Sequence, residues 1–275
     1  MTAEGAKRVS PARTVPVALT IAGSDSGGGA GIQADLKTFA SLGVFGTSAI
    51  TCLTAQNPDR VDGVEEVSPA MVARQIRTVC AGFPVAAAKT GMLFSAPIIR
   101  AVAREADRCG FRRLVVDPVM ISTSGARLLR DDAVAALCRE LLPLATVITP
   151  NLPEAEALLG ERIVSIEDMK AAAEALTRRF GCASVVKGGH CEGSRVHDLL
   201  FDGRRMTVLT SPRLKVRETH GTGCTFSAAL AANLAAGRGL ADAFREAKGY
   251  VAAALRNATR AGRHSPLGWR RPDRD

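Results

Sequence analysis

Two glycines, two hydroxyl groups and a thiol precede an apolar, alanine-rich segment near the end of the chain, in the run THGTGCTFSAALAA (Thr219 to Ala232). Glycine lets the backbone turn its N–H groups toward a ligand, and the start of a helix adds partial positive charge at the same place. We therefore predict an anion hole at Gly221, Thr222 and Gly223, beside Cys224. The alternative is an ordinary glycine-rich turn in which Thr222 or Thr225 caps the helix.

A second glycine cluster lies in the run GSDSGGGAGIQADLK (Gly23 to Lys37), after an apolar run. The glycines are followed by Ile32, Leu36 and Phe39 at helical spacing. This order predicts a strand, a glycine loop and a helix. A dinucleotide-binding loop is disfavoured, because Ile32 stands where a third glycine belongs, three positions after Gly29. The chain also lacks the G-x-x-x-x-G-K-[ST] loop of the P-loop kinases.

Apolar strand-like runs alternate with helix-like segments along the chain, which predicts an α/β fold with a mostly parallel sheet and helices on both faces. The strand-like runs are VALTIA, TSAITCLTA, VAAAKTG, RLVVDP, TVITPN and ASVVKGG, and the helix-like segments are 32–42, 69–81, 96–109, 131–141, 167–180, the segment after Cys224, and 242–257. The pair HDLLFD and RMTVLT predicts a late antiparallel hairpin.

Polar residues and glycines follow the predicted strands where each strand ends. They are Gly23, Asp25, Gln56, Asn57, Lys89, Gly91, Asp117, Asn151, Glu154, Lys187 and Gly188. Ligands of open α/β sheets bind beyond the carboxyl ends of the strands. The mixture of lysines, carboxylates, amides and glycines suits a phosphate, a metal ion and a polar ring.

The length of 275 residues and a hydrophobic content of 47% suit one large domain. We expect a disordered N-terminal extension (1–15), a single domain (16–258) and a basic C-terminal tail (259–275). The formal charge of +9 lies largely in residues 1–14 and 256–275, which supply +2 and +4 of it. A body of +3 with one Trp and one Tyr offers no basic and aromatic surface for bases, so we expect no nucleic-acid partner.

Seven cysteines are scattered along the chain without a C-x-x-C pair or a histidine at a metal-ligand spacing, which is typical of free thiols in a reducing compartment. No run of eighteen apolar residues occurs, and the N-terminus lacks the apolar core of a signal peptide. We therefore expect a cytoplasmic protein that binds no membrane.

Seven motifs in order, AGSDSGGGAGIQADLK, LTAQN, KTGM, VVDPVM, ITPNLPEAEALL, VKGGH and HGTGC, make the chain from Val17 to Ala254 resemble the hydroxymethylpyrimidine/phosphomethylpyrimidine kinases of thiamine biosynthesis. The resemblance implies a ribokinase-like fold, commonly dimeric. It implies transfer of the γ-phosphoryl group of ATP, with Mg²⁺, to 4-amino-5-hydroxymethyl-2-methylpyrimidine and then to its monophosphate.

Three alternatives remain beside this reading. A pyridoxal or pyridoxine kinase would use the same scaffold, although Gln56 and the form HGTGC favour the pyrimidine. A catalytically silent pyrimidine-binding protein would not need Lys187, Asp117 and Glu154. A nicotinamide oxidoreductase would need the pyrophosphate fingerprint that is absent here.

The resemblance also implies roles for residues on the substrate side. Gln56 matches the glutamine that bonds the aminopyrimidine edge, for which a side-chain amide offers both a donor and an acceptor. Other matching positions of the pocket wall are Gly23, Ala30, Asp35, Met92 and Val119. Met92 and Val119 could equally be core residues, and Asp35 could serve the first turn of its helix.

On the nucleotide side, Asp117 and Glu154 match positions that hold Mg²⁺ through water, and Asn151 and Thr222 match nucleotide-binding positions. Lys187 is expected to contact the oxygens of the transferring phosphoryl group.

Cys224 stands where the wider superfamily has an aspartate base. A helix N-terminus lowers the pKa of a thiol, so we expect a base or a substrate contact there. His190 and His220 could contact phosphate. Glycine and serine in residues 122–125 suggest a lid.

Overall fold

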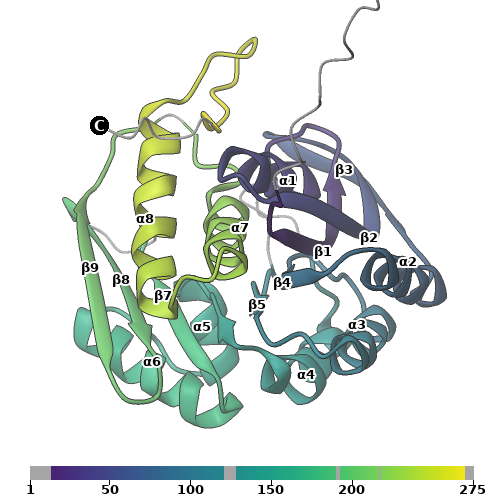
Figure 1. The fold of residues 1–275 in the computed structure, drawn as a ribbon. Coiled ribbons are helices and arrows are strands. Elements are labelled where there is room, and N and C mark those ends of the chain that lie inside the picture. Colours follow the sequence, from purple (N-terminus) through teal and green to yellow (C-terminus); the bar gives the residue numbers. More distant parts are fainter. Residues whose placement is uncertain (1–13, 121–127, 190–192, 217, 270–275) are drawn as a thin grey trace, which may run out of the picture.

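A computed structural model describes residues 14–120, 128–189, 193–216 and 218–269. Within these residues the chain forms one sheet of nine strands in the order β3-β2-β1-β4-β5-β6-β7-β8-β9. Helices cover both faces of this sheet (Figure 1). Residues 1–13 of the predicted disordered extension lie outside the described residues. The predicted lid, 122–125, also lies outside them.

The strands of the parallel part of the sheet carry the apolar runs of the sequence. They are β1 (Val17–Asp25), β2 (Phe45–Asn57), β4 (Val85–Thr90), β5 (Leu114–Val116), β6 (Val147–Ile148) and β7 (Ala183–Lys187). The predicted late hairpin is confirmed as β8 (Arg195–Phe201) and β9 (Met206–Pro212), which pair antiparallel. The predicted α/β fold class is therefore confirmed.

A further strand, β3 (Arg60–Glu66), pairs antiparallel with β2 at the opposite edge of the sheet. The sequence analysis missed β3, because its residues RVDGVEE are mostly polar and none of them is buried. An edge strand can be polar on both faces, so it leaves no apolar run to detect.

The helices divide into two layers. One face of the sheet packs against α1 (Gly31–Ser41), α7 (Thr222–Ala235) and α8 (Leu240–Arg256), whereas the other packs against α2 (Pro69–Gly82), α3 (Ala96–Cys109), α4 (Asp131–Ala136), α5 (Leu152–Leu159) and α6 (Ile166–Phe180). Figure 1 shows α7 and α8 together on one side and α5 and α6 on the other. The predicted helix 131–141 is divided, since α4 continues as a π-helical turn over Leu137–Leu141.

Strand β1 lies between β2 and β4, so the strands that follow it are added first on one side of β1 and then on its other side. Such a reversal of strand order opens a crevice at the carboxyl ends of the two neighbouring strands. Here those ends carry the residues around Gly23 and Gly91. The topology thus places the predicted pocket at the switch point of the sheet.

A buried ion pair joins β4 to α1 at this switch point. Lys89 Nζ lies 2.9 and 2.8 Å from the two carboxylate oxygens of Asp35, and neither side chain is exposed. Thr20 Oγ1 donates a further hydrogen bond of 2.6 Å to Asp35 Oδ2. Burial alone would lower the pKa of Lys89, but Asp35 and other negative neighbours raise it, so the lysine stays charged.

Residues 259–269, the described part of the predicted basic tail, pack against the domain. Leu267 is buried, and the N–H of Gly268 donates to the carbonyl of Ala254 at 2.9 Å. The indole of Trp269 lies against α7, where it bonds Thr225. Among the described residues no helix is long and apolar enough to cross a membrane.

We predict that Lys89→Met lowers the free energy of unfolding by about 3 to 5 kcal/mol, because it leaves the Asp35 carboxylate buried without its partner. The double variant Lys89→Met with Asp35→Asn removes both charges and should recover a large part of this loss. Urea unfolding followed by circular dichroism measures both effects. A double variant as unstable as Lys89→Met alone would contradict the assignment.

Candidate active site

Two glycine loops from opposite ends of the chain meet at backbone distance. Gly221 precedes α7 with a φ of 81°, in the left-handed region that favours glycine. A Cβ atom on Gly221 would lie 1.8 Å from the carbonyl oxygen of Gly29, so no side chain fits there. The glycine cluster of the N-terminal loop and the predicted anion hole are therefore parts of one site.

The carboxylate of Asp25 holds the N-terminal glycine loop. It accepts hydrogen bonds from the N–H groups of Gly27, Gly29 and Ala30 at 2.8, 3.0 and 2.7 Å, and His220 Nε2 lies 3.0 Å away. Burial acts to raise the pKa of Asp25, but the bonds to His220 and to the loop lower it overall. Because the loop turns these N–H groups toward Asp25, it is a structural loop and not a phosphate cradle.

The first turn of α7 is the stronger candidate for anion binding. The first N–H groups of a helix have no partner within the helix. A Cβ on Gly223 would lie 3.5 Å from Lys187 Nζ, so the bare backbone at this point faces an ammonium group. Thr222 Oγ1 donates to the carbonyl of Thr219 at 2.9 Å, which shapes the turn. The structure thus brings Lys187, Gly221 and Gly223 together as predicted.

Lys187 ends β7 and forms an ion pair with the buried carboxylate of Asp117, with Nζ 3.0 Å from Oδ1. Burial acts to lower the pKa of Lys187, but Asp117 and Glu154 raise it overall. Thr149 Oγ1 donates to Asp117 Oδ1 at 2.9 Å, and Ser227 Oγ, from the second turn of α7, donates to Oδ2 at 3.0 Å. Asp117 is thereby fixed between β5 and α7.

Glu154 and Asn151 form a capping box at the start of α5. Asn151 Oδ1 accepts from the N–H of Glu154 at 2.9 Å, and Glu154 Oε2 accepts from the N–H of Asn151 at 2.8 Å. Burial raises the pKa of Glu154 to about 7; Lys187 opposes this rise and Asp117 adds to it. Asn151 therefore has a structural role as a helix cap, whatever it contributes to nucleotide binding.

The two carboxylates of Asp117 and Glu154 suit a hydrated divalent cation. A cation beside them would lower the pKa of Glu154, which burial and the charge of Asp117 raise. The described residues contain no group of three or more His, Cys, Asp or Glu side chains that could hold a metal ion. A cation here would therefore need water and phosphate oxygens as its remaining ligands, as Mg²⁺ prefers.

Cys224 lies where the first turns of α7 and α1 approach each other. The N–H of Gly31 bonds to its thiol, and Lys89 lowers its pKa, whereas Asp35 and Asp117 raise it. The largest effect is burial, and the pKa of Cys224 rises to about 11. The prediction of a lowered thiol pKa is wrong, because desolvation and two carboxylates outweigh Lys89 and the N–H of Gly31.

The wall of the predicted substrate pocket is built around Gly23. A Cβ on Gly23 would lie 2.7 Å from Cys52 Sγ and 3.3 Å from Met92 Sδ, so glycine leaves room for both side chains. Met92 and Val119 belong to one small apolar cluster with Cys52 and Leu128, separate from the two large cores. This placement is consistent with a pocket wall.

Gln56 lies at the end of β2, across from the glycine loop. Its N–H donates to Ser26 Oγ, Ser26 Oγ donates to its carbonyl oxygen, both at 2.8 Å, and Thr54 Oγ1 donates to Oε1 at 3.2 Å. Ala30 stands at the N-cap position of α1. Asp35 differs, since its carboxylate is fully buried and bound to Lys89 and Thr20.

The sequence analysis missed the supporting residues Thr149 and Ser227, and it left Asp25, Lys89 and His220 without the partners they have here. Ser227 stands one helical turn after Gly223, and this spacing predicts that both lie on the same face of α7. His190 lies outside the described residues. His220 bonds Asp25, so its predicted phosphate contact stays a hypothesis.

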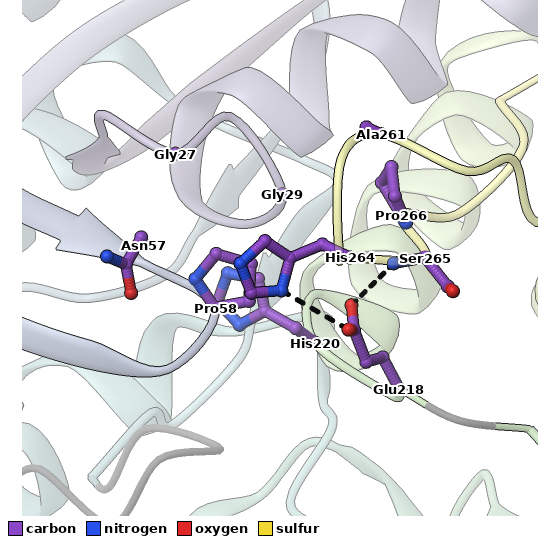
Figure 2. Close-up of a pocket in the computed structure, with 10 residues that line it drawn as sticks. All are labelled: Gly27, Gly29, Asn57, Pro58, Glu218, His220, Ala261, His264, Ser265 and Pro266. Carbon is purple, nitrogen blue, oxygen red and sulfur yellow. Dashed lines mark hydrogen bonds and ion pairs between the residues drawn. The ribbon is translucent and has the colours of Figure 1, made fainter.

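A cavity of about 260 Å³ lies beside the glycine loop. Figure 2 shows the residues that line it: Gly27, Gly29, Asn57, Pro58, Glu218, His220, Ala261, His264, Ser265 and Pro266. Four segments enclose it, namely the glycine loop, the turn after β2, the loop before α7 and the C-terminal residues 261–266. The anion hole adjoins this cavity through His220.

The chain was compared with known proteins. The model of the phosphomethylpyrimidine kinase family matches residues 25–267. A hydroxymethylpyrimidine/phosphomethylpyrimidine kinase of Rhizobium meliloti (strain 1021) is 52% identical over 245 residues, which cover 89% of this chain and 92% of the relative.

Two solved structures resemble the fold. The phosphomethylpyrimidine kinase from Clostridium difficile 630 has a TM-score of 0.77 at 40% identity and covers 86% of this chain and 98% of that one. An ADP complex of Bacillus subtilis pyridoxal kinase has a TM-score of 0.86 at 38% identity and covers 92% and 97%. Because the family model and these relatives cover most of its length, the chain belongs to the phosphomethylpyrimidine kinase family.

Proposed function

We propose that the protein transfers the γ-phosphoryl group of ATP to the hydroxymethyl group of 4-amino-5-hydroxymethyl-2-methylpyrimidine, and then a second phosphoryl group to the monophosphate, for thiamine biosynthesis. The carrying observation is the ammonium group of Lys187 over the bare backbone of Gly223, at the N-terminus of α7. Asp117 and Glu154 lie at the same place. This arrangement suits a transferring phosphoryl group with a metal ion beside it.

In the first transfer, the hydroxymethyl oxygen forms a bond to the γ-phosphorus of ATP while the bond between that phosphorus and the β-γ bridging oxygen breaks, and ADP leaves. Negative charge spreads over the oxygens of the transferring group. Lys187 and the N–H groups at the start of α7, around Gly221 and Gly223, would stabilise that charge. They are held in place by Asp117 and by the contact between Gly221 and Gly29.

Asp117 and Glu154 would hold Mg²⁺ through water. Asn151 bonds Glu154, and Thr222 begins α7 beside Gly223, so both would contact the bound nucleotide. When bound, Mg²⁺ supplies charge neutralisation between the β- and γ-phosphates. Solved relatives bind ADP, and one binds AMP-PCP together with pyridoxal. These complexes support ATP as the co-substrate of this chain.

Cys224 is proposed as a substrate contact and not as a thiolate base. A thiol with a pKa of about 11 is protonated at neutral pH. A loose phosphoryl-transfer transition state requires little early removal of the alcohol proton, so the proton can leave late, to the product phosphate or to water. The rest of the pyrimidine site would be formed by Gly23, Gln56, Ala30, Asp35, Met92 and Val119.

The runner-up is a pyridoxal kinase, since the Bacillus subtilis pyridoxal kinase shares the fold closely.

We also propose a cytoplasmic homodimer with no nucleic-acid or membrane partner. Six described cysteines are free thiols, in keeping with a reducing compartment. Size-exclusion chromatography with light scattering tests the dimer.

The assay that tests the function follows ADP release with Mg-ATP on the pyrimidine alcohol, pyridoxal and pyridoxine, with the product masses recorded. We expect mono- and then diphosphate from the pyrimidine, because its amino edge matches the amide of Gln56. Turnover of pyridoxal alone would move the chain to the runner-up. No turnover of any of the three would refute a kinase.

We predict that Lys187→Met lowers kcat by about 100-fold or more, because a cation aimed at the transferring group is lost. Cys224→Ser should lower kcat by about tenfold or less, since the hydroxyl keeps a polar contact without a base. Steady-state kinetics at saturating Mg-ATP measure both. A Cys224→Ser loss as large as that of Lys187→Met would contradict the assigned roles.

The raised pKa of Cys224 predicts slow alkylation by iodoacetamide at pH 7.5, with a rate that rises as the pH approaches about 11, because only the thiolate reacts. Intact-mass spectrometry of the protein and of Cys224→Ser, compared at each pH, isolates this thiol from the others. A rate already at its plateau at pH 8 would show a lowered pKa.

A further inference from the structure

We propose that residues 259–269, here named the C-terminal strap, position the first turn of α7 and with it the anion hole; the proposal rests on the proposed phosphoryl transfer. In this inference Trp269 is a positioning residue that acts through Thr225. The strap is the described part of the basic C-terminal tail (259–275) that the sequence predicts.

The strap has a defined path. The N–H of Thr259 donates to the carbonyl of Pro266 at 3.0 Å, and Ala261 and His264 exchange two backbone bonds of 3.0 and 3.1 Å. A Cβ on Gly268 would lie 2.1 Å from the carbonyl oxygen of Asn257, so the strap returns to the end of α8 at backbone distance. These contacts fix where Trp269 lies.

Trp269 joins the strap to α7. Its indole Nε1 donates to Thr225 Oγ1 at 3.2 Å, and Thr225 is fully buried next to Cys224. The N–H of Thr225 makes the first helical bond of α7, to the carbonyl of Gly221, at 2.9 Å. The indole therefore bonds the residue that closes the turn in which the anion hole lies.

The same ring reaches the glycine loop. Lys37 Nζ lies 4.5 Å from the centroid of the Trp269 ring, within the range of a cation–π contact, and donates to the carbonyl of Gly28 at 2.6 Å. One aromatic side chain thus touches α7 directly and the glycine loop through one lysine. These are the two segments whose backbones meet at Gly221 and Gly29.

The middle of the strap holds the approach to the anion hole. The N–H of Ser265 donates to Glu218 Oε2 at 2.8 Å, and His264 Nδ1 lies 3.2 Å from Glu218 Oε1 (Figure 2). Glu218 stands two residues before His220. Arg263 pairs with Asp59 of the turn after β2. The loop before α7 and the turn after β2 are therefore both in contact with the strap.

The test is a double-mutant cycle of Trp269→Phe and Thr225→Val. Phe keeps a ring over Lys37 without the indole N–H, and Val keeps the shape of Thr without its hydroxyl. We expect each change to lower kcat about threefold to tenfold, the range for a lost neutral hydrogen bond. We expect KM for Mg-ATP and for the pyrimidine to change less than about twofold, because the anion hole acts on the transition state.

The double variant should be no slower than the slower single variant, because both changes remove the same bond. Losses of kcat that multiply would overturn the proposal, as would single variants with the kcat of the wild type. If a variant lost kcat and folded fraction to the same extent, the bond would have a structural role alone, and this result too would overturn the proposal. Arg260→Ala is the matched control, since this exposed strap residue bonds the carbonyl of Gly262 and should leave kcat unchanged.

A second readout does not depend on turnover. Trp269 is the only tryptophan of the chain, so its fluorescence reports docking of the strap. We expect acrylamide to quench it more strongly in Thr225→Val than in the wild type. Equal quenching would overturn the docking contact. Normal quenching with no kinase activity in the wild type would instead refute the proposed function and leave the contact intact.

Discussion

Gly221 approaches Gly29 so closely that even a methyl group would overlap the carbonyl oxygen, and this contact sets the distance between the two halves of the site. One loop follows the first strand of the sheet and the other precedes α7. Asp25 ties both together, since its carboxylate bonds the glycine loop and His220. Lys187, Asp117 and Cys224 acquire their neighbours only because this contact holds α7 against β1 and α1.

Much of the fold could be predicted, because buried parallel strands are apolar runs and their helices are amphipathic or alanine-rich. The late hairpin was also predicted, since both of its strands carry apolar residues on either side of a polar turn. Strand β3 and the C-terminal strap were missed for the opposite reason. Polar pairing at an edge and backbone contacts near Gly268 leave no periodic pattern in the sequence.

The ends of the strands indicated where the site lies, but not which of its residues pair with one another. Asp35 and Lys89 were visible as single residues, and only the structure pairs them out of contact with solvent. Asp25 and the glycine loop show the same limit, because the loop donates its N–H groups to a carboxylate of the protein. The thiol of Cys224 shows it most clearly, since burial raises its pKa by more than Lys89 and the N–H of Gly31 lower it.

The position of α7 has a consequence for synthesis of the protein. This helix is almost entirely apolar and lies against β1, β4 and α1, all of which are made before it. Until α7 and the strap leave the ribosome, the nascent chain exposes an apolar sheet face and has no anion hole, so it is both prone to aggregation and inactive. Solubility and activity are therefore gained together, late in translation, and a prematurely terminated chain would lack both.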